Sequence, residues 1–241
     1  MPVFFRASDG TELAYHVRGK GAPLICVPGG PMRASAYLGD LGGLDRYRQL
    51  ILLDLRGTGA SATPADPSSY RCDRLVDDVL ALQDHLDLEP DATARRAVIA
   101  LRSAEPWYAP AAAAFERIAD GQPSDEDWQA IAPFYYGCWD AAAQAYDAAQ
   151  EQQVNEDAAS AFGAPGAFDP DVTRAALAAF DAPTLVLGGD LDLQRPPGVS
   201  EDFAALFRYA QLVIQPGAGH FPWLDDADLF AATVNAFLDA R

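Results

Sequence analysis

Short apolar segments separated by turn residues dominate the first part of the chain. Residues 2–6 and 12–18 are rich in β-prone residues on either side of a turn at residues 8–10, a pattern that predicts a hairpin. Residues 23–27 and 48–55 are continuous apolar runs, each followed by a glycine-containing loop. Because continuous apolar positions are typical of strands buried on both faces, these two runs predict part of a parallel sheet.

The next segments repeat apolar residues at helical spacing. Residues 73–88 place Leu and Val three and four positions apart, with Asp73 as a candidate N-cap, and predict an amphipathic helix that ends before Pro90. Residues 91–168 are rich in Ala and aromatic residues, so we expect a helical subdomain there. The run AVIAL at 97–101 is an alternative strand, but helix is the preferred interpretation because no glycine follows it.

Strands and helices then alternate to the end of the chain. Apolar runs at 183–187 and 211–215 predict two further buried strands. Helical patterns occupy residues 172–180, 200–207 and 226–239. The chain therefore predicts the α/β class with a mostly parallel sheet. The expected organisation is a first core segment at 1–90, a helical subdomain at 91–168 and a second core segment at 169–241.

Composition excludes several classes of partner and cofactor. The 241 residues are 50% hydrophobic and carry a net charge of −18, which argues against nucleic acid or anionic membrane as a partner. Cys26, Cys72 and Cys138 match no disulfide or zinc spacing, and no two histidines share a metal-ligand spacing, so we expect no metal and no cofactor. The N-terminus has no signal-peptide pattern and no apolar run reaches the ~18 residues of a membrane span, which favours a soluble cytoplasmic protein.

Two polar residues follow the two late strands. Asp192 comes just after the first of them and His220 just after the second. Active-site groups in open parallel sheets lie at the carboxyl ends of strands, and a carboxylate that orients an imidazole is a common general-base arrangement. The alternatives are a turn or capping role for Asp192 and a buried, satisfied imidazole for His220. The other histidines, His16 and His85, are expected to be structural.

A proline–glycine loop follows the apolar run at 23–27. Its two central glycines, Gly29 and Gly30, allow backbone N–H groups to face a small cavity, which suits an anion or an oxyanion. The alternative is a simple tight turn.

Four motifs, in this order, resemble the α/β-hydrolase superfamily: PGGP, DLRGTGAS, GGDLD and GAGHFPW. The proline iminopeptidase-like hydrolases are the most similar subgroup. Residues 54–61 match their D-x-R-G-x-G-x-S pattern in full, whereas the first motif departs from HGGPG at Pro28 and Met32. The resemblance implies an α/β-hydrolase fold with residues 91–168 as a helical cap and with the strand order 1-2-4-3-5-6-7-8.

The resemblance also implies roles for single residues. By position, Asp192 corresponds to the acid of a catalytic triad, His220 to its base and the Gly30 amide to one oxyanion donor. The nucleophile is the exception, because the family places it in G-x-S-x-G on a strand-to-helix turn and none of the nine serines has glycine at both −2 and +2. The alternatives weighed were Ser61, Cys26 and Ser103, none of which has such a turn.

The chain is also shorter than the family pattern. Members of that family typically have just under 300 residues, so roughly 45 residues are absent from this chain. That is about the size of one β–α–β unit, and the missing unit would carry the nucleophile and strands 5 and 6. Without that unit the strands 23–27 and 183–187 each lose a partner. Because unpaired central edges expose backbone groups, we expect these two strands to pair in parallel and to complete a six-stranded sheet.

Two functions therefore stay open. One is a serine hydrolase that cleaves a small amide or ester, for instance an N-terminal residue from a short peptide. An acidic, aromatic-rich cap fits a cationic N-terminus beside an apolar side chain. The other is a catalytically inactive, degenerate or internally deleted hydrolase that acts at most as a binding protein for a small molecule or peptide.

Overall fold

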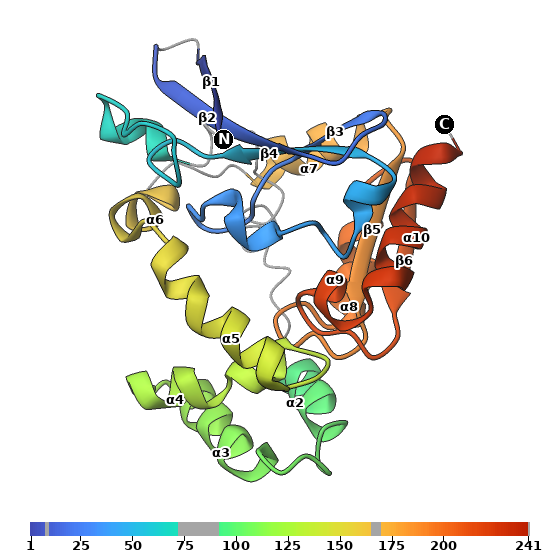
Figure 1. Ribbon diagram of the computed structural model, residues 1–241. Coiled ribbons are helices and arrows are strands. Elements are labelled where there is room, and N and C mark those ends of the chain that lie inside the picture. The colour runs from blue at the N-terminus through green and yellow to red at the C-terminus, as the bar shows by residue number, and fades with distance from the viewer. Residues whose placement is uncertain (8–9, 72–91, 165–169, 241) are drawn as a thin grey trace. The chain divides into compact units, whose positions relative to one another are not determined.

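The computed structural model describes residues 1–7, 10–71, 92–164 and 170–240 (Figure 1). The expected helix at 73–88, together with Cys72 and His85, lies outside these residues. The chain forms two compact units. The first unit comprises residues 1–87 and 148–173, and the second comprises residues 88–147 and 174–241. The expected division at residues 90 and 168 follows chain order rather than these units and stays a prediction.

A four-stranded mixed sheet lies in the first unit. Its strands are β1 (Val3–Arg6), β2 (Glu12–Arg18), β3 (Pro23–Cys26) and β4 (Gln49–Asp54). The order is β1-β2-β4-β3, in which β1 and β2 form the expected hairpin, β2 runs antiparallel to β4, and β3 runs parallel to β4. This order is the 1-2-4-3 beginning of the strand order that the resemblance implies.

The second unit contains a separate two-stranded parallel sheet. It consists of β5 (Thr184–Gly189) and β6 (Ala210–Gln215). Both strands were expected from their apolar runs. The described strands form a four-stranded sheet in the first unit and a two-stranded sheet in the second. The expected pairing of β3 with β5 would join the two units, and it stays a prediction. In the described sheet β3 is an edge strand, which leaves Ile25 69% exposed instead of buried.

Helices and turns fill the described residues between β4 and β5, where no extended strand occurs. This confirms the helical interpretation for residues 92–164, the described part of that segment, and the AVIAL run falls largely within a helix. The α-helices of this region are α2 (Ala92–Ala100), α3 (Tyr108–Ala119), α4 (Asp125–Ala130), α5 (Ala141–Gln150), α6 (Glu156–Phe162) and α7 (Pro170–Ala178). Short 3-10 helices are η1 (Ser35–Leu38), η2 (Leu44–Arg46), η3 (Pro67–Tyr70), η5 (Ala132–Tyr135) and η6 (Glu151–Gln153).

Three helices accompany the two-stranded sheet: α8 (Pro197–Ala204), α9 (Pro222–Asp225) and α10 (Ala227–Asp239). The helix expected at 200–207 begins three residues earlier, at Pro197, because proline suits the first turn of a helix. Helices α2 to α4 share an apolar core with Leu193, the residue next to Asp192. The site loop after β5 is therefore anchored in the helical part of the same unit.

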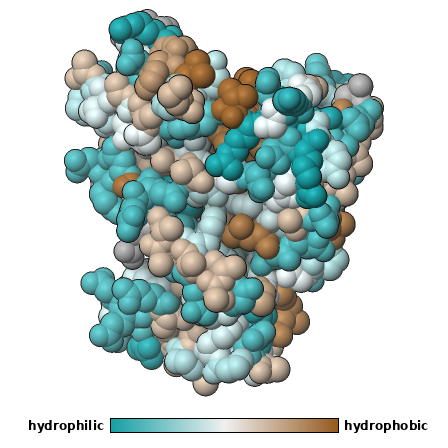
Figure 2. Space-filling model, viewed as in Figure 1, coloured by the Kyte–Doolittle hydropathy of each residue, from teal (hydrophilic) through white to brown (hydrophobic). Residues whose placement is uncertain are grey.

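The surface combines charged and apolar residues. Polar residues cover most of the face shown in Figure 2, with smaller apolar areas between them. The β1–β2 hairpin contributes several of the exposed apolar side chains, namely Val3, Phe4, Phe5 and Val17. Edge strands of this kind pair readily with other chains unless charges interrupt them, and here Arg6 and Glu12 pair with each other next to the turn of the hairpin.

One buried carboxylate explains the D-x-R-G-x-G-x-S motif. Asp54 is 2% exposed, and its Oδ1 accepts hydrogen bonds from the Ser35 amide (2.9 Å) and hydroxyl (2.7 Å). Its Oδ2 accepts from the Ala60 amide (2.9 Å) and lies 3.0 Å from His16 Nε2. Burial raises the pKa of Asp54, but these hydrogen bonds outweigh it and hold the pKa below its ordinary value. Gly59 lies against the carboxylate, with no room for a Cβ.

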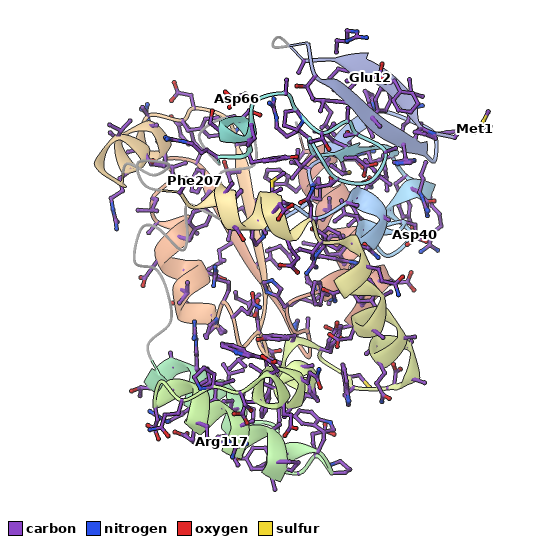
Figure 3. All side chains as sticks on the ribbon, turned by 90° about the vertical axis from the view of Figure 1, so that its left-hand side faces the viewer. Met1, Glu12, Asp40, Asp66, Arg117 and Phe207 are labelled. Atoms are coloured by element: carbon purple, nitrogen blue, oxygen red, sulfur yellow. The ribbon has the colours of Figure 1, made fainter. Side chains whose placement is uncertain are left out.

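A capping box joins α3 and α4. The Ser124 hydroxyl accepts from the Asp127 amide, and the Asp127 carboxylate accepts from the Ser124 amide. Arg117 of α3, labelled in Figure 3, donates from Nε to the same carboxylate at 2.9 Å. The hydrogen bond from Arg117 lowers the pKa of Asp127 to about 2, against the opposing effect of burial.

We expect Asp127→Asn to lower the melting temperature at neutral pH, since it removes the charge that Arg117 and Ser124 both bind. The folded pKa lies below the ordinary value, so this stabilisation is present above pH ~4 and is lost as the pH falls toward ~2. Thermal unfolding at about pH 7 and about pH 2.5 measures the difference. The matched control is Glu116→Gln, which removes the exposed pair with Arg96 and is expected to cost less. An equal loss at both pH values would contradict the assignment.

Candidate active site

The second unit brings Asp192 and His220 together. Because β5 and β6 are parallel neighbours, the loops at their carboxyl ends lie side by side. Asp192 Oδ2 is 3.0 Å from His220 Nδ1, within hydrogen-bond distance. Asp190, the other acid of the loop, accepts from the Gly217 amide instead. The expected pairing of Asp192 with His220 is therefore confirmed as geometry, while the catalytic roles of the two residues stay a prediction.

The surroundings of Asp192 favour its ionised form. The residue is 4% exposed, and its second oxygen accepts from the Gln194 amide (2.8 Å) and the Arg195 amide (3.0 Å). Burial raises the pKa of Asp192, but the charge and hydrogen bond of His220 and the two amides outweigh it, so the pKa lies below its ordinary value. An ionised Asp192 favours the proton on His220 Nδ1 and leaves Nε2 as the basic nitrogen.

Aromatic side chains surround the histidine loop. The ring of Phe221 lies edge-on to the His220 ring, with 5.2 Å between centroids. Phe221 also contacts Tyr136, whose hydroxyl donates to Asp147 at 2.8 Å. Nearby rings complete the cluster, which includes Tyr135, Trp139, Tyr146 and Trp223. The sequence predicted an aromatic-rich helical segment, and the structure places part of it beside His220.

Comparison with known proteins identifies the fold. No family model matches the chain. A 71-residue segment is 35% identical to a proline iminopeptidase of Heyndrickxia coagulans, and it spans 30% of this chain and 25% of that curated relative. Among solved structures, a proline iminopeptidase from Mycobacterium smegmatis superposes with a TM-score of 0.69 at 21% identity, over 100% of this chain and 98% of the other.

Two further structures give the same result. A hydrolase from Pseudomonas aeruginosa PA01 superposes with a TM-score of 0.61 at 25% identity, over 98% of both chains. An esterase from Exiguobacterium antarcticum superposes with a TM-score of 0.65 at 17% identity, over 99% of this chain and 100% of the other. This chain has the α/β-hydrolase fold. It resembles the proline iminopeptidases within that fold, as its motifs indicate.

The proline–glycine loop of this α/β-hydrolase fold lies in the first unit. Gly30 is exposed in the turn after β3, and its neighbour Gly29 donates its amide to the Tyr37 hydroxyl at 2.7 Å. Met32 has a φ of 54°, in the left-handed region that favours glycine, which explains why the family pattern has glycine at this position. The Met32 side chain is buried in an apolar cluster with Leu55 and others. Gly30 as an oxyanion donor stays a prediction.

The three candidate nucleophiles of this α/β-hydrolase fold lie in surroundings that do not favour that role. The Ser61 hydroxyl donates to the Asp54 carbonyl oxygen (2.7 Å) and accepts from a β2 amide, so its role is structural. Ser103 is exposed in the turn after α2. Burial raises the pKa of the Cys26 thiol to about 11, which makes it a poor nucleophile. Among the described residues of the second unit, no serine or cysteine side chain hydrogen-bonds to His220.

Sequence reasoning missed one residue of this site. Asp225 ends α9, five residues after His220, and accepts hydrogen bonds from three backbone amides. Burial raises the pKa of Asp225 above its ordinary value, even though the three amides and the charge of Arg102 act in the opposite direction. The sequence offers only an acid shortly after a histidine, and it does not distinguish Asp225 from Asp226, which caps α10.

Over residues 1–7, 10–71, 92–164 and 170–240, no group of three or more His, Cys, Asp or Glu residues is placed to hold a metal ion. None of the helices in those ranges is long and apolar enough to cross a membrane.

Proposed function

We propose that Asp192 and His220 form the acid–base part of a serine-hydrolase-type site for small peptide amides or esters. The observation that carries this proposal is the 3.0 Å contact between Asp192 Oδ2 and His220 Nδ1. In such a site the ionised carboxylate keeps the proton on Nδ1, so Nε2 takes the proton of an attacking hydroxyl and later returns it to the leaving group. The Gly30 amide is the proposed oxyanion donor.

The proposed substrate is small and has an apolar group next to the bond that is cleaved. The aromatic cluster beside His220 supports an apolar group, and the net charge of −18 supports a cationic amino terminus. Two proteins with the same fold are named a proline iminopeptidase and an esterase. The proposal includes no cofactor, no nucleic acid and no membrane, and it places the protein in the cytoplasm.

A second candidate is an inactive hydrolase that acts at most as a binding protein. It is favoured by the hydrogen bonds of the described serines of the second unit, none of which involves His220, and by the absent G-x-S-x-G motif. Covalent catalysis requires a residue that can be acylated, and the family takes its second oxyanion donor from the residue after the nucleophile. Loss of a single oxyanion donor costs ~10²–10³ in rate, and loss of the nucleophile costs more.

We expect the chain to form no covalent adduct with a fluorophosphonate serine probe, and to turn over prolyl and acyl chromogenic substrates negligibly. The measurement is the intact mass of the purified chain after incubation with the probe, with a known serine hydrolase labelled in parallel. A stoichiometric adduct on a serine, absent from His220→Ala, would instead support the active hydrolase and identify its nucleophile. An adduct that persists in His220→Ala would indicate non-specific labelling and would not support the active hydrolase.

A further inference from the structure

Asp225 lies where two loops of the second unit meet. One loop, residues 216–220, follows β6 and carries His220. The other loop, residues 135–138, begins at the last residue of the short helix η5. Asp225 Oδ2 accepts from the Gly219 amide at 2.8 Å, while Oδ1 accepts from the Gly137 amide at 2.9 Å and the Cys138 amide at 3.3 Å. One carboxylate therefore bridges the two loops.

The two loops touch backbone to backbone. The His220 amide donates to the Tyr135 carbonyl oxygen at 2.8 Å, next to the Gly219 amide that Asp225 binds. A Cβ at Gly219 would meet the Tyr135 carbonyl, and one at Gly137 would meet the Gly217 carbonyl. Because the backbones of the two loops approach this closely, no side chain of either loop fits between them. The amides that face it need an external acceptor, and Asp225 supplies it.

A cation holds the second loop from another side. Arg102 is buried and donates from Nη1 to the Tyr136 carbonyl oxygen at 2.7 Å. Its guanidinium also lies over the Trp107 ring, 4.8 Å from the centroid. The positive charge of Arg102 stabilises the ionised form of Asp225. The 135–138 loop is thus a fixed support against which the histidine loop is held.

We propose that Asp225 is a positioning residue, which holds the Gly219 amide and thereby fixes the His220 backbone so that Nδ1 reaches Asp192. The inference rests on the proposed function of His220. Asp225 needs both carboxylate oxygens for this role, because they face donors on two different loops. Asparagine has the same shape but one oxygen and one NH₂ group, so Asp225→Asn places a donor against a donor at one of the loops.

The test uses the ring nitrogen signals of His220 in NMR spectra of protein labelled with ¹⁵N-histidine, recorded at about pH 8.5, above the ordinary histidine pKa of about 6.5. In the wild type, the bond to Asp192 should give a ring protonated almost entirely on Nδ1. In Asp225→Asn, we expect signals averaged between the two tautomers, because the ring is no longer held. His220→Gln assigns the signals.

Two controls separate positioning from folding. His16 bonds to Asp54 through Nε2 in the first unit, so its ring signals should stay unchanged in Asp225→Asn. Asp226→Asn makes the same charge change one residue away and retains an acceptor for the Leu229 amide, so His220 should stay protonated on Nδ1. If Asp225→Asn does not fold, Asp225→Glu displaces the carboxylate by one methylene and should also reduce the Nδ1 form.

The outcomes distinguish the positioning role from the proposed function. A wild-type His220 protonated on Nδ1, with averaged tautomers in the Asp225 variants only, supports the proposal. A wild-type His220 that already shows averaged tautomers overturns the Asp192–His220 pair, and the positioning role with it. An Asp225 variant that folds and keeps His220 fully protonated on Nδ1 overturns the positioning role and leaves the proposed function standing.

Discussion

Replacing Asp54 by alanine is expected to lower the free energy of unfolding by about 3–5 kcal/mol, since buried donors left without an acceptor cost about 1–3 kcal/mol each. The carboxylate accepts from Ser35 twice, from Ala60 and from His16, and it is almost fully buried. Water therefore has little access to the amides and the hydroxyl once the carboxylate is removed. The loss would affect the start of η1 and the glycine motif after β4 together.

The effect of Asp54→Ala should depend on pH. The folded pKa of Asp54 lies below its ordinary value, so the stabilisation is fully present above about pH 4 and is lost as the pH falls through the folded pKa. Urea unfolding at neutral and acidic pH measures this trend as a shrinking difference between wild type and variant. Asp66→Ala is the matched control, because Asp66 also accepts from an amide and a hydroxyl but is exposed. Its expected cost is about 1 kcal/mol.

The helices and strands and half of the candidate site were predictable from local sequence patterns. Continuous apolar runs located β3 to β6, and the composition of residues 91–168 indicated helices, because these signals depend on neighbouring residues alone. The pairing of Asp192 with His220 was also predictable. Parallel strands bring their carboxyl ends together, so two polar residues that each follow such a strand become neighbours.

Features that depend on distant residues were not predictable. The edge position of β3 in its sheet depends on which strands pair. The apolar sequence of a strand is the same whether or not a neighbouring strand is present, so the sequence alone does not predict the edge position. Asp54 gains its importance from His16 and Ser35, 38 and 19 positions away. Asp225 binds a loop 87 and 88 positions earlier, and no sequence pattern marks such a contact.

Gly59→Ala should destabilise the protein by more than about 3 kcal/mol, because two costs combine there. Its φ of 52° is strained for any residue with a Cβ, and the added carbon would meet the Asp54 carboxylate. Relief requires the carboxylate to move, and that movement breaks its hydrogen bond to the Ala60 amide. The glycine is therefore required both for its backbone conformation and for space.

Gly121→Ala separates these two costs. Gly121 has a similar φ of 73° just after α3, but a Cβ there would meet no atom within 4 Å. Only the backbone strain remains, so we expect a loss of about 1–2 kcal/mol. Chemical denaturation of both variants gives the difference, which measures the crowding at Asp54. Equal losses would mean that the Asp54 carboxylate can move aside without losing its hydrogen bonds. Glycine would then be required at position 59 for its backbone conformation alone.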